Sequence, residues 1–109
     1  MSKGLIDISE LSKQIVERLK FMDFEKIILF GSYAYGKPSV YSDIDICIVR
    51  NINSSKLKLK REIRKQLKDI IIAKDILVPT KEEYEFYKTQ SGSVFKDIET
   101  RGKVLWSSF

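Results

Sequence analysis

The sequence predicts an α/β fold in which helices pack against a small β-sheet. Three short apolar runs rich in β-forming residues alternate along the chain with segments of helical periodicity. The chain has 109 residues, of which 43% are hydrophobic and 32% charged, and this suits one globular core but not two. We therefore expect a single domain over residues 1–109, while the order of the strands does not follow from the pattern.

The first half of the chain begins with an amphipathic helix and continues with two strands. Apolar residues of this helix recur at three- and four-residue spacing, and Asp7 is placed to cap its N-terminus. The first strand ends at Gly31, and Gly36 and Pro38 interrupt the segment after it. The predicted elements are a helix over 8–22, a turn over 23–25, a strand over 26–30, a short helix or turn over 32–37 and a strand over 42–49.

The second half of the chain predicts three helices and two further strands. Ser54 or Ser55 can cap the first of these helices, Thr80 can cap the second, and Gly102 can end the third. The predicted elements are a helix over 56–72, a strand over 73–79, a helix over 81–90, a helix over 94–100 and an edge strand over 104–106.

The helix over 56–72 supplies the whole positive excess of the chain. The net charge is +5, and residues 51–80 hold eight basic and three acidic side chains, whereas the segments on either side are balanced. Such a surface can attract nucleic acid, a nucleotide or an acidic protein, but a solvated helix face is the simpler interpretation. The predicted apolar stripe is Leu59, Ile63, Leu67, Ile70 and Ile71, and the basic residues that occupy the rest of the helix include Lys56, Lys60, Arg61, Arg64, Lys65 and Lys68.

The composition excludes several kinds of site. One cysteine and no histidine rule out a disulfide framework and a Cys/His zinc site, and any acid–base chemistry must use Asp, Glu, Lys, Tyr or the substrate itself. No apolar run approaches the roughly 20 residues of a membrane span, and the N-terminal residues lack the apolar region of a signal peptide. We expect a cytoplasmic protein that makes no membrane contact.

Two carboxylates lie inside the apolar run of the second strand. Asp43 and Asp45 alternate with Ile44 and Ile46, so both point to the same face of the strand. A carboxylate buried without a partner costs many kcal/mol, and two like charges close together repel each other. A hard divalent cation with oxygen ligands offsets both costs.

Gly31 and Ser32 follow the first strand directly and can offer backbone N–H groups to an anion. Asp75 stands at the start of the third strand, which can neighbour the second and so add a third carboxylate. Three such groups can hold one or two Mg²⁺ ions beside a phosphate, with Asp75 as the candidate base for an attacking hydroxyl. Taken singly, Gly31-Ser32 is an ordinary turn, Asp43 a capping residue and Asp75 a solvated strand start.

The remaining aromatic residues and the cysteine favour packing over chemistry. Cys47 is expected to be a small core residue. Three tyrosines near the carboxylates either stack on a base or cover the end of the sheet, with packing the simpler interpretation, and three aromatic residues of the helix over 81–90 are expected to face the core. The first three are Tyr33, Tyr35 and Tyr41, and the second three are Tyr84, Phe86 and Tyr87.

The combined pattern is more specific than its parts. Gly31-Ser32, ten intervening residues and then Asp-x-Asp within an apolar strand resembles the signature of the nucleotidyltransferase superfamily that includes DNA polymerase beta. The length resembles the minimal nucleotidyltransferase branch. The resemblance covers nearly the whole chain, from the first helix through ILFGSYAYGKPSVYSDIDICIV to Asp75 in KDILV and the closing IETRGKVLW.

The resemblance implies a small mixed β-sheet with helices packed against it, and a nucleotide site. Gly31 and Ser32 would hold the β- and γ-phosphates of ATP. Asp43, Asp45 and Asp75 would together bind two Mg²⁺ ions. The reaction would be transfer of AMP from ATP to a hydroxyl, with pyrophosphate leaving. Lys37 and Ser42 complete the predicted nucleotide-binding set.

This sequence departs from the family at two positions. Many relatives carry Arg after Gly-Ser and again two residues on, whereas Tyr33 and Tyr35 occupy those positions here. Lys37 can supply a single positive charge to the phosphates but not the bidentate fork of Arg.

The resemblance also implies a partner. Minimal nucleotidyltransferases are typically encoded beside a HEPN-domain protein, a toxic ribonuclease that they neutralise as antitoxins by adding AMP to a tyrosine. The chain would then form a hetero-oligomer with this toxin, through the basic helix or through the end of the sheet near Tyr33–Tyr41.

Three alternatives to this function differ in class. The chain can be an enzyme acting on a small molecule, as antibiotic nucleotidyltransferases do, although those carry an additional domain. It can be an antitoxin that blocks its partner by binding alone. Nucleic-acid binding through the basic helix is the least favoured alternative, because aromatic residues are not interleaved with the basic ones.

Overall fold

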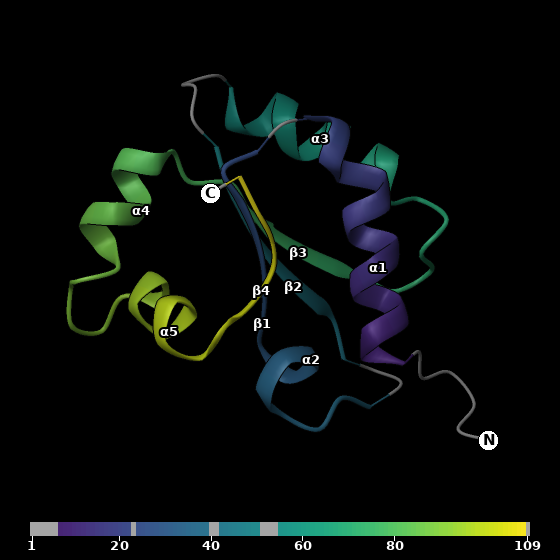
Figure 1. Cartoon of the computed structure of the whole chain (residues 1–109), viewed down its shortest axis with the longest axis horizontal. Coiled ribbons are helices and arrows are strands. Elements are labelled where there is room, and N and C mark those ends of the chain that lie inside the picture. The colour runs from purple at the N-terminus through teal and green to yellow at the C-terminus, as the bar shows by residue number, and fades with distance from the viewer. Residues whose placement is uncertain (1–6, 23, 40–41, 51–54, 109) are drawn as a thin grey trace.

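A mixed β-sheet between two layers of helices forms the centre of the protein (Figure 1). The computed structural model describes residues 7–22, 24–39, 42–50 and 55–108. Over these residues the sheet has four strands in the order β3-β2-β1-β4, with β2 and β3 parallel and the other two pairs antiparallel. The strands are β1 (Lys26–Phe30), β2 (Ile44–Val49), β3 (Lys74–Leu77) and β4 (Lys103–Ser107).

The helices alternate with the strands, as predicted. A turn of 3₁₀-helix, η1, extends the first helix, so the two together cover the predicted range 8–22. The α/β class and the mixed sheet are both confirmed. The helical elements are α1 (Ile8–Leu19), η1 (Lys20–Met22), α2 (Ser32–Tyr35), α3 (Lys56–Gln66), α4 (Lys81–Tyr87) and α5 (Val94–Arg101).

Each face of the sheet has its own core. On one face Ile27, Ile46 and Ile48 pack in a cluster with Leu11 and Ile63, so α1 and α3 cover it. On the other face lies a smaller cluster beneath α4 and α5, and Figure 1 shows these two pairs of helices on opposite sides of the sheet. This second cluster contains Ile28, Phe30, Cys47, Val49, Tyr84 and Ile98.

Helix α3 ends six residues earlier than predicted. The backbone of Leu67 leaves helical geometry, with φ −103° and ψ 13°, and the chain turns toward β3. Ile63, Leu67 and Ile70 are buried as expected, but Ile71 is 94% exposed, so its predicted place in the apolar stripe is wrong. Helical periodicity does not extend past Leu67, because the turn re-orients the residues that follow it.

Helix α4 buries fewer aromatic residues than predicted. Tyr84 is buried against the sheet, whereas Phe86 is 59% exposed and Tyr87 46% exposed, so the prediction that both face the core is wrong. Phe86 lies two residues after Tyr84 and therefore projects from nearly the opposite side of the helix. Tyr87 stands at the last residue of this short helix, beyond the edge of the core.

Side-chain caps fix most helix ends where the sequence placed them. Asp7 caps α1, Ser55 caps α3 and Gly102 follows the last residue of α5.

Cys47 is fully buried in the core, and burial raises its pKa to about 12. Among the described helices none is both long and apolar enough to cross a membrane. The predictions for residues 23, Tyr41 and Ser54 lie outside the described residues.

The cap of α4 gives a stability prediction. Thr80 accepts from the N–H of Glu83 while the Glu83 carboxylate accepts from the N–H of Thr80, at 3.1 and 2.9 Å. Thr80→Ala removes one half of this capping box, so we expect the free energy of unfolding to fall by about 1 kcal/mol in chemical denaturation. Thr100→Ala is the control, because the exposed Thr100 hydroxyl bonds only carbonyls of its own helix, and its loss should stay under about 0.5 kcal/mol. Equal losses in the two variants would contradict this role of Thr80.

Candidate active site

The turn after β1 brings the backbone of Gly31 against a carboxylate of the next strand. Gly31 has φ +74°, a conformation that side chains rarely adopt. A Cβ atom at this position would overlap Asp45 Oδ2. The glycine is therefore needed for two reasons, the backbone conformation and the space that the Asp45 side chain occupies.

Strand pairing places two carboxylates side by side. Asp45 is the register partner of Asp75 in the parallel pair β2–β3, so both side chains point to the same face of the sheet. This is the face that α4 and α5 cover further along, since Asp45 alternates with Cys47 of that core. Asp45 is half-buried and Asp75 exposed. Burial, and then the charges of Asp75 and Asp43, raise the pKa of Asp45.

Asp43 lies just outside this pair. It precedes the first residue of β2 and is exposed, although its charge still acts on Asp45. Within the described ranges, no three acidic, cysteine or histidine side chains gather closely enough to hold a metal ion, so the three aspartates do not form a ready-made cluster. Their ligand roles remain predictions.

The donor set nevertheless fits Mg²⁺. This ion prefers oxygen ligands and is usually held by one or two carboxylates together with substrate phosphates, which the pair Asp45 and Asp75 can provide. The repulsion that raises the pKa of Asp45 is also the kind of charge crowding that a cation relieves.

The other predicted nucleotide-binding residues differ in their exposure and contacts. Ser32 is the first residue of α2, directly after Gly31, and is half-buried. Ser42 Oγ accepts from the N–H of Ser39 at 2.9 Å, so this hydroxyl closes the turn that leads to Asp43. Lys37 is exposed in the segment after α2. The structure thus brings Gly31, which precedes Ser32, against Asp45 and pairs Asp45 with Asp75, and it leaves Lys37 at the surface.

Tyr33 and Tyr35, which stand where many relatives carry Arg, have different roles. Tyr33 is buried in the core, so packing is its role, as predicted. Tyr35 donates from its hydroxyl to Asp97 Oδ2 at 2.8 Å and thereby ties α2 to α5. Burial and this hydrogen bond raise the pKa of Tyr35, while the Gly31 backbone and the charge of Arg101 act in the opposite direction.

Arg101 is the residue that sequence reasoning missed. Its guanidinium carbon lies 4.0 Å from the centroid of the Tyr35 ring, and Arg101 also pairs with Asp97 at 3.5 Å. Arg101 of α5 thus places a guanidinium next to Tyr35, which is one of the two positions where many relatives carry Arg. No local signal marks Arg101, because only the packing of α5 onto α2 brings it there.

Taken together, these residues form a short glycine turn, a pair of carboxylates on one face of the sheet and an arginine stacked on Tyr35 of the helix that follows the turn. Close backbone approach and a guanidinium suit phosphate oxygens, and carboxylates suit a hard cation bound to the same phosphates. The arrangement fits phosphoryl or nucleotidyl chemistry on a nucleotide.

Comparison with solved structures shows that the fold is shared with chains from toxin–antitoxin complexes. One crystal structure of a toxin–antitoxin with AMP-PNP superimposes with a TM-score of 0.68 at 23% identity, covering 89% of this chain and 73% of that chain. The MntA–HepT toxin–antitoxin structure gives 0.62 at 19%, covering 92% and 73%. The tri-AMPylated HEPN toxin of Shewanella oneidensis in complex with MNT antitoxin gives 0.64 at 20%, covering 94% and 74%.

Comparison with protein families adds the sequence-level result. A search of curated proteins finds no significant match. The family model of the nucleotidyltransferase domain, however, matches residues 8–104, which span both Gly31-Ser32 and the three aspartates. The chain therefore belongs to the nucleotidyltransferase domain family, and the predicted enzyme class, nucleotidyltransferase, is confirmed.

Proposed function

We propose that this chain transfers AMP from ATP to a tyrosine hydroxyl of a HEPN-type toxin and acts as its antitoxin. The single observation that supports this most directly is the pairing of Asp45 with Asp75 beside the Gly31 turn. Membership of the nucleotidyltransferase family supports the reaction class. The fold shared with a complex of MNT antitoxin and AMPylated HEPN toxin supports the choice of acceptor.

In this proposal the turn after β1 holds the outer phosphates. Gly31 lets the backbone approach the β- and γ-phosphates, and Ser32 adds a hydroxyl and a backbone N–H. Arg101 adds the fork of donors that the sequence lacks after Gly-Ser, since it stacks on Tyr35 next to this turn. Ser42 shapes the approach to Asp43, and Lys37 contributes long-range positive charge.

The carboxylates act at the α-phosphate. Asp45 and Asp75, with Asp43 at the entrance of the strand, would hold Mg²⁺ against the phosphate oxygens. When bound, Mg²⁺ supplies charge neutralisation at the transferred phosphoryl group. Asp75 is the exposed member of the pair, so it is the carboxylate that an incoming hydroxyl meets.

The reaction is an in-line displacement. The acceptor oxygen forms a bond to the α-phosphorus as the bond from that phosphorus to the bridging oxygen breaks, and pyrophosphate leaves with the bonding electrons. The hydroxyl proton passes to Asp75, which is the candidate base because the chain has no histidine. The products are an AMP ester of the acceptor and pyrophosphate.

The first prediction concerns transfer itself. With labelled ATP, Mg²⁺ and the product of the adjacent gene, expected to be a HEPN-domain protein, the native chain should label this partner with AMP. Asp43→Ala combined with Asp45→Ala should reduce the label to background, because it removes two of the three carboxylates. Mass spectrometry of the partner should locate the AMP on a tyrosine. Neutralisation of the toxin by the double variant would instead indicate an antitoxin that acts by binding alone.

The second prediction concerns Gly31. Gly31→Ala imposes backbone strain of about 1–3 kcal/mol and pushes the Asp45 carboxylate from its place, so AMP transfer should fall on the order of 100-fold. Gly92→Ala is the matched control, because Gly92 also has positive φ, +83°, but no atom lies within 4 Å of the added Cβ. It should retain transfer, because it adds backbone strain without displacing a neighbouring side chain. Equal activities of the two variants would contradict the importance of this close approach.

The third prediction concerns Arg101. Arg101→Ala should weaken the affinity for ATP roughly tenfold in calorimetric titration, because a hydrogen bond to a charged group contributes about 1.5–3 kcal/mol. Lys103→Ala, which removes the same charge from an exposed position two residues on, should leave this affinity within about twofold. An affinity that is the same in the two variants would exclude Arg101 from phosphate binding.

A further inference from the structure

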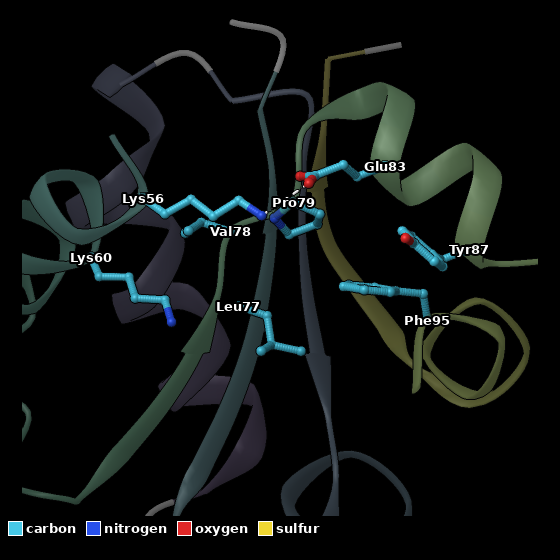
Figure 2. A pocket seen from close by; sticks show the side chains of 8 residues that line it. All are labelled: Lys56, Lys60, Leu77, Val78, Pro79, Glu83, Tyr87 and Phe95. Atoms are coloured by element: carbon cyan, nitrogen blue, oxygen red, sulfur yellow. Dashed lines mark hydrogen bonds and ion pairs between the residues drawn. The ribbon is translucent and has the colours of Figure 1, made fainter. Parts of the chain in front are cut away.

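A pocket of about 320 Å³ lies along the edge strand β3, between α3 on one face of the sheet and α4 and α5 on the other (Figure 2). Helix α3 contributes Lys56 and Lys60 to one wall, and Tyr87 and Phe95 of α4 and α5 form the opposite one. Leu77 of β3 lies between these walls at the centre of the view. The pocket is therefore bounded by a basic wall, an aromatic wall and an apolar floor.

The pocket approaches the candidate active site at Leu77. Leu77 follows Asp75 by two residues in β3, so the two side chains share a face and lie about 7 Å apart along the strand. A group held over Leu77 is thus one side chain away from Asp75, which is the proposed base. A partner segment seated here would place its neighbouring residue at the reacting phosphate.

The basic wall contains a charge without a counter-charge. Lys56 forms an ion pair with Glu83, with 3.0 Å between Nζ and Oε2. Lys60 is half-buried and, across the described residues, has neither an ion pair nor a side-chain hydrogen bond. An ammonium group that has no counter-charge and lies beside an apolar floor can bind an anionic ligand.

The aromatic wall continues onto the surface. The rings of Tyr87 and Phe95 are 6.3 Å apart, and those of Phe86 and Tyr87 are 5.0 Å apart. Phe86 and Tyr87 are 59% and 46% exposed. A row of aromatic rings that runs from a pocket onto the surface suits a protein partner better than a small ligand, because aromatic residues are enriched in such interfaces.

We propose that this pocket docks the acceptor-bearing segment of the partner protein. An apolar or aromatic side chain of the segment packs between Leu77 and the rings of Tyr87 and Phe95, and an acidic residue next to it pairs with Lys60. The segment then presents its hydroxyl to Asp75. This inference rests on the proposed function for the identity of the partner, while the docking contacts are independent of chemistry.

The test is reversal of the charge at Lys60. Lys60→Glu should raise the Kd for the product of the adjacent gene about tenfold or more, measured without ATP, and should leave the affinity for ATP unchanged. Lys58→Glu is the matched control. It introduces the same charge change on the other side of α3, at a residue that does not line the pocket. Tyr87→Ala should also weaken partner binding several-fold, and circular dichroism should show all three variants folded.

Several outcomes would overturn the inference. Equal partner affinity of Lys60→Glu and Lys58→Glu would do so, as would no partner binding by the native chain. A loss of ATP affinity in Lys60→Glu with normal partner affinity would assign the pocket to the nucleotide instead. Partner binding that depends on Lys60 without any AMP transfer by the native chain would support the docking site while contradicting the proposed reaction.

Discussion

The close approach of the Asp45 carboxylate to the Gly31 backbone is the contact on which the candidate site depends. It exists because β1 and β2 pair antiparallel with Phe30 opposite Asp45, so the end of one strand lies beside the start of the other. Asp45 stands between apolar residues, but the absence of a side chain at Gly31 leaves room for its carboxylate. One turn thus provides both an approach for phosphate and a place for a carboxylate.

One face of the sheet is covered by packed helices, and the other carries the carboxylates of the candidate site. Helices α1 and α3 cover one face completely with apolar side chains. On the other face the core beneath α4 and α5 stops short of the strand ends that carry Asp45 and Asp75. Asp75 is therefore exposed and Asp45 partly exposed, although both stand next to buried residues of their strands, and this avoids much of the desolvation cost of a charged group in a core.

Helix α5 links the two parts of this face. Its Asp97 and Arg101 fix Tyr35 next to the Gly31 turn, while its Phe95 lines the pocket beyond Asp75. The proposed phosphate contacts and the proposed docking pocket therefore flank the carboxylates from opposite sides along the same strands. In the proposed function, this order of phosphates, reacting centre and acceptor would suit an in-line displacement.

The sequence by itself determined the fold class and nearly every element, because periodicity, caps and glycine turns are local properties. It also predicted the two segments of the candidate site, Gly31-Ser32 and the run with Asp43 and Asp45. Only the tertiary structure decided which residues share a face. The register of β2 against β3 paired Asp45 with Asp75 and left Asp43 outside the strand, and the end of α3 at Gln66 turned Ile71 to solvent. Packing of α5 brought Arg101 to Tyr35. Such pairings join residues far apart in the chain, so no local pattern records them.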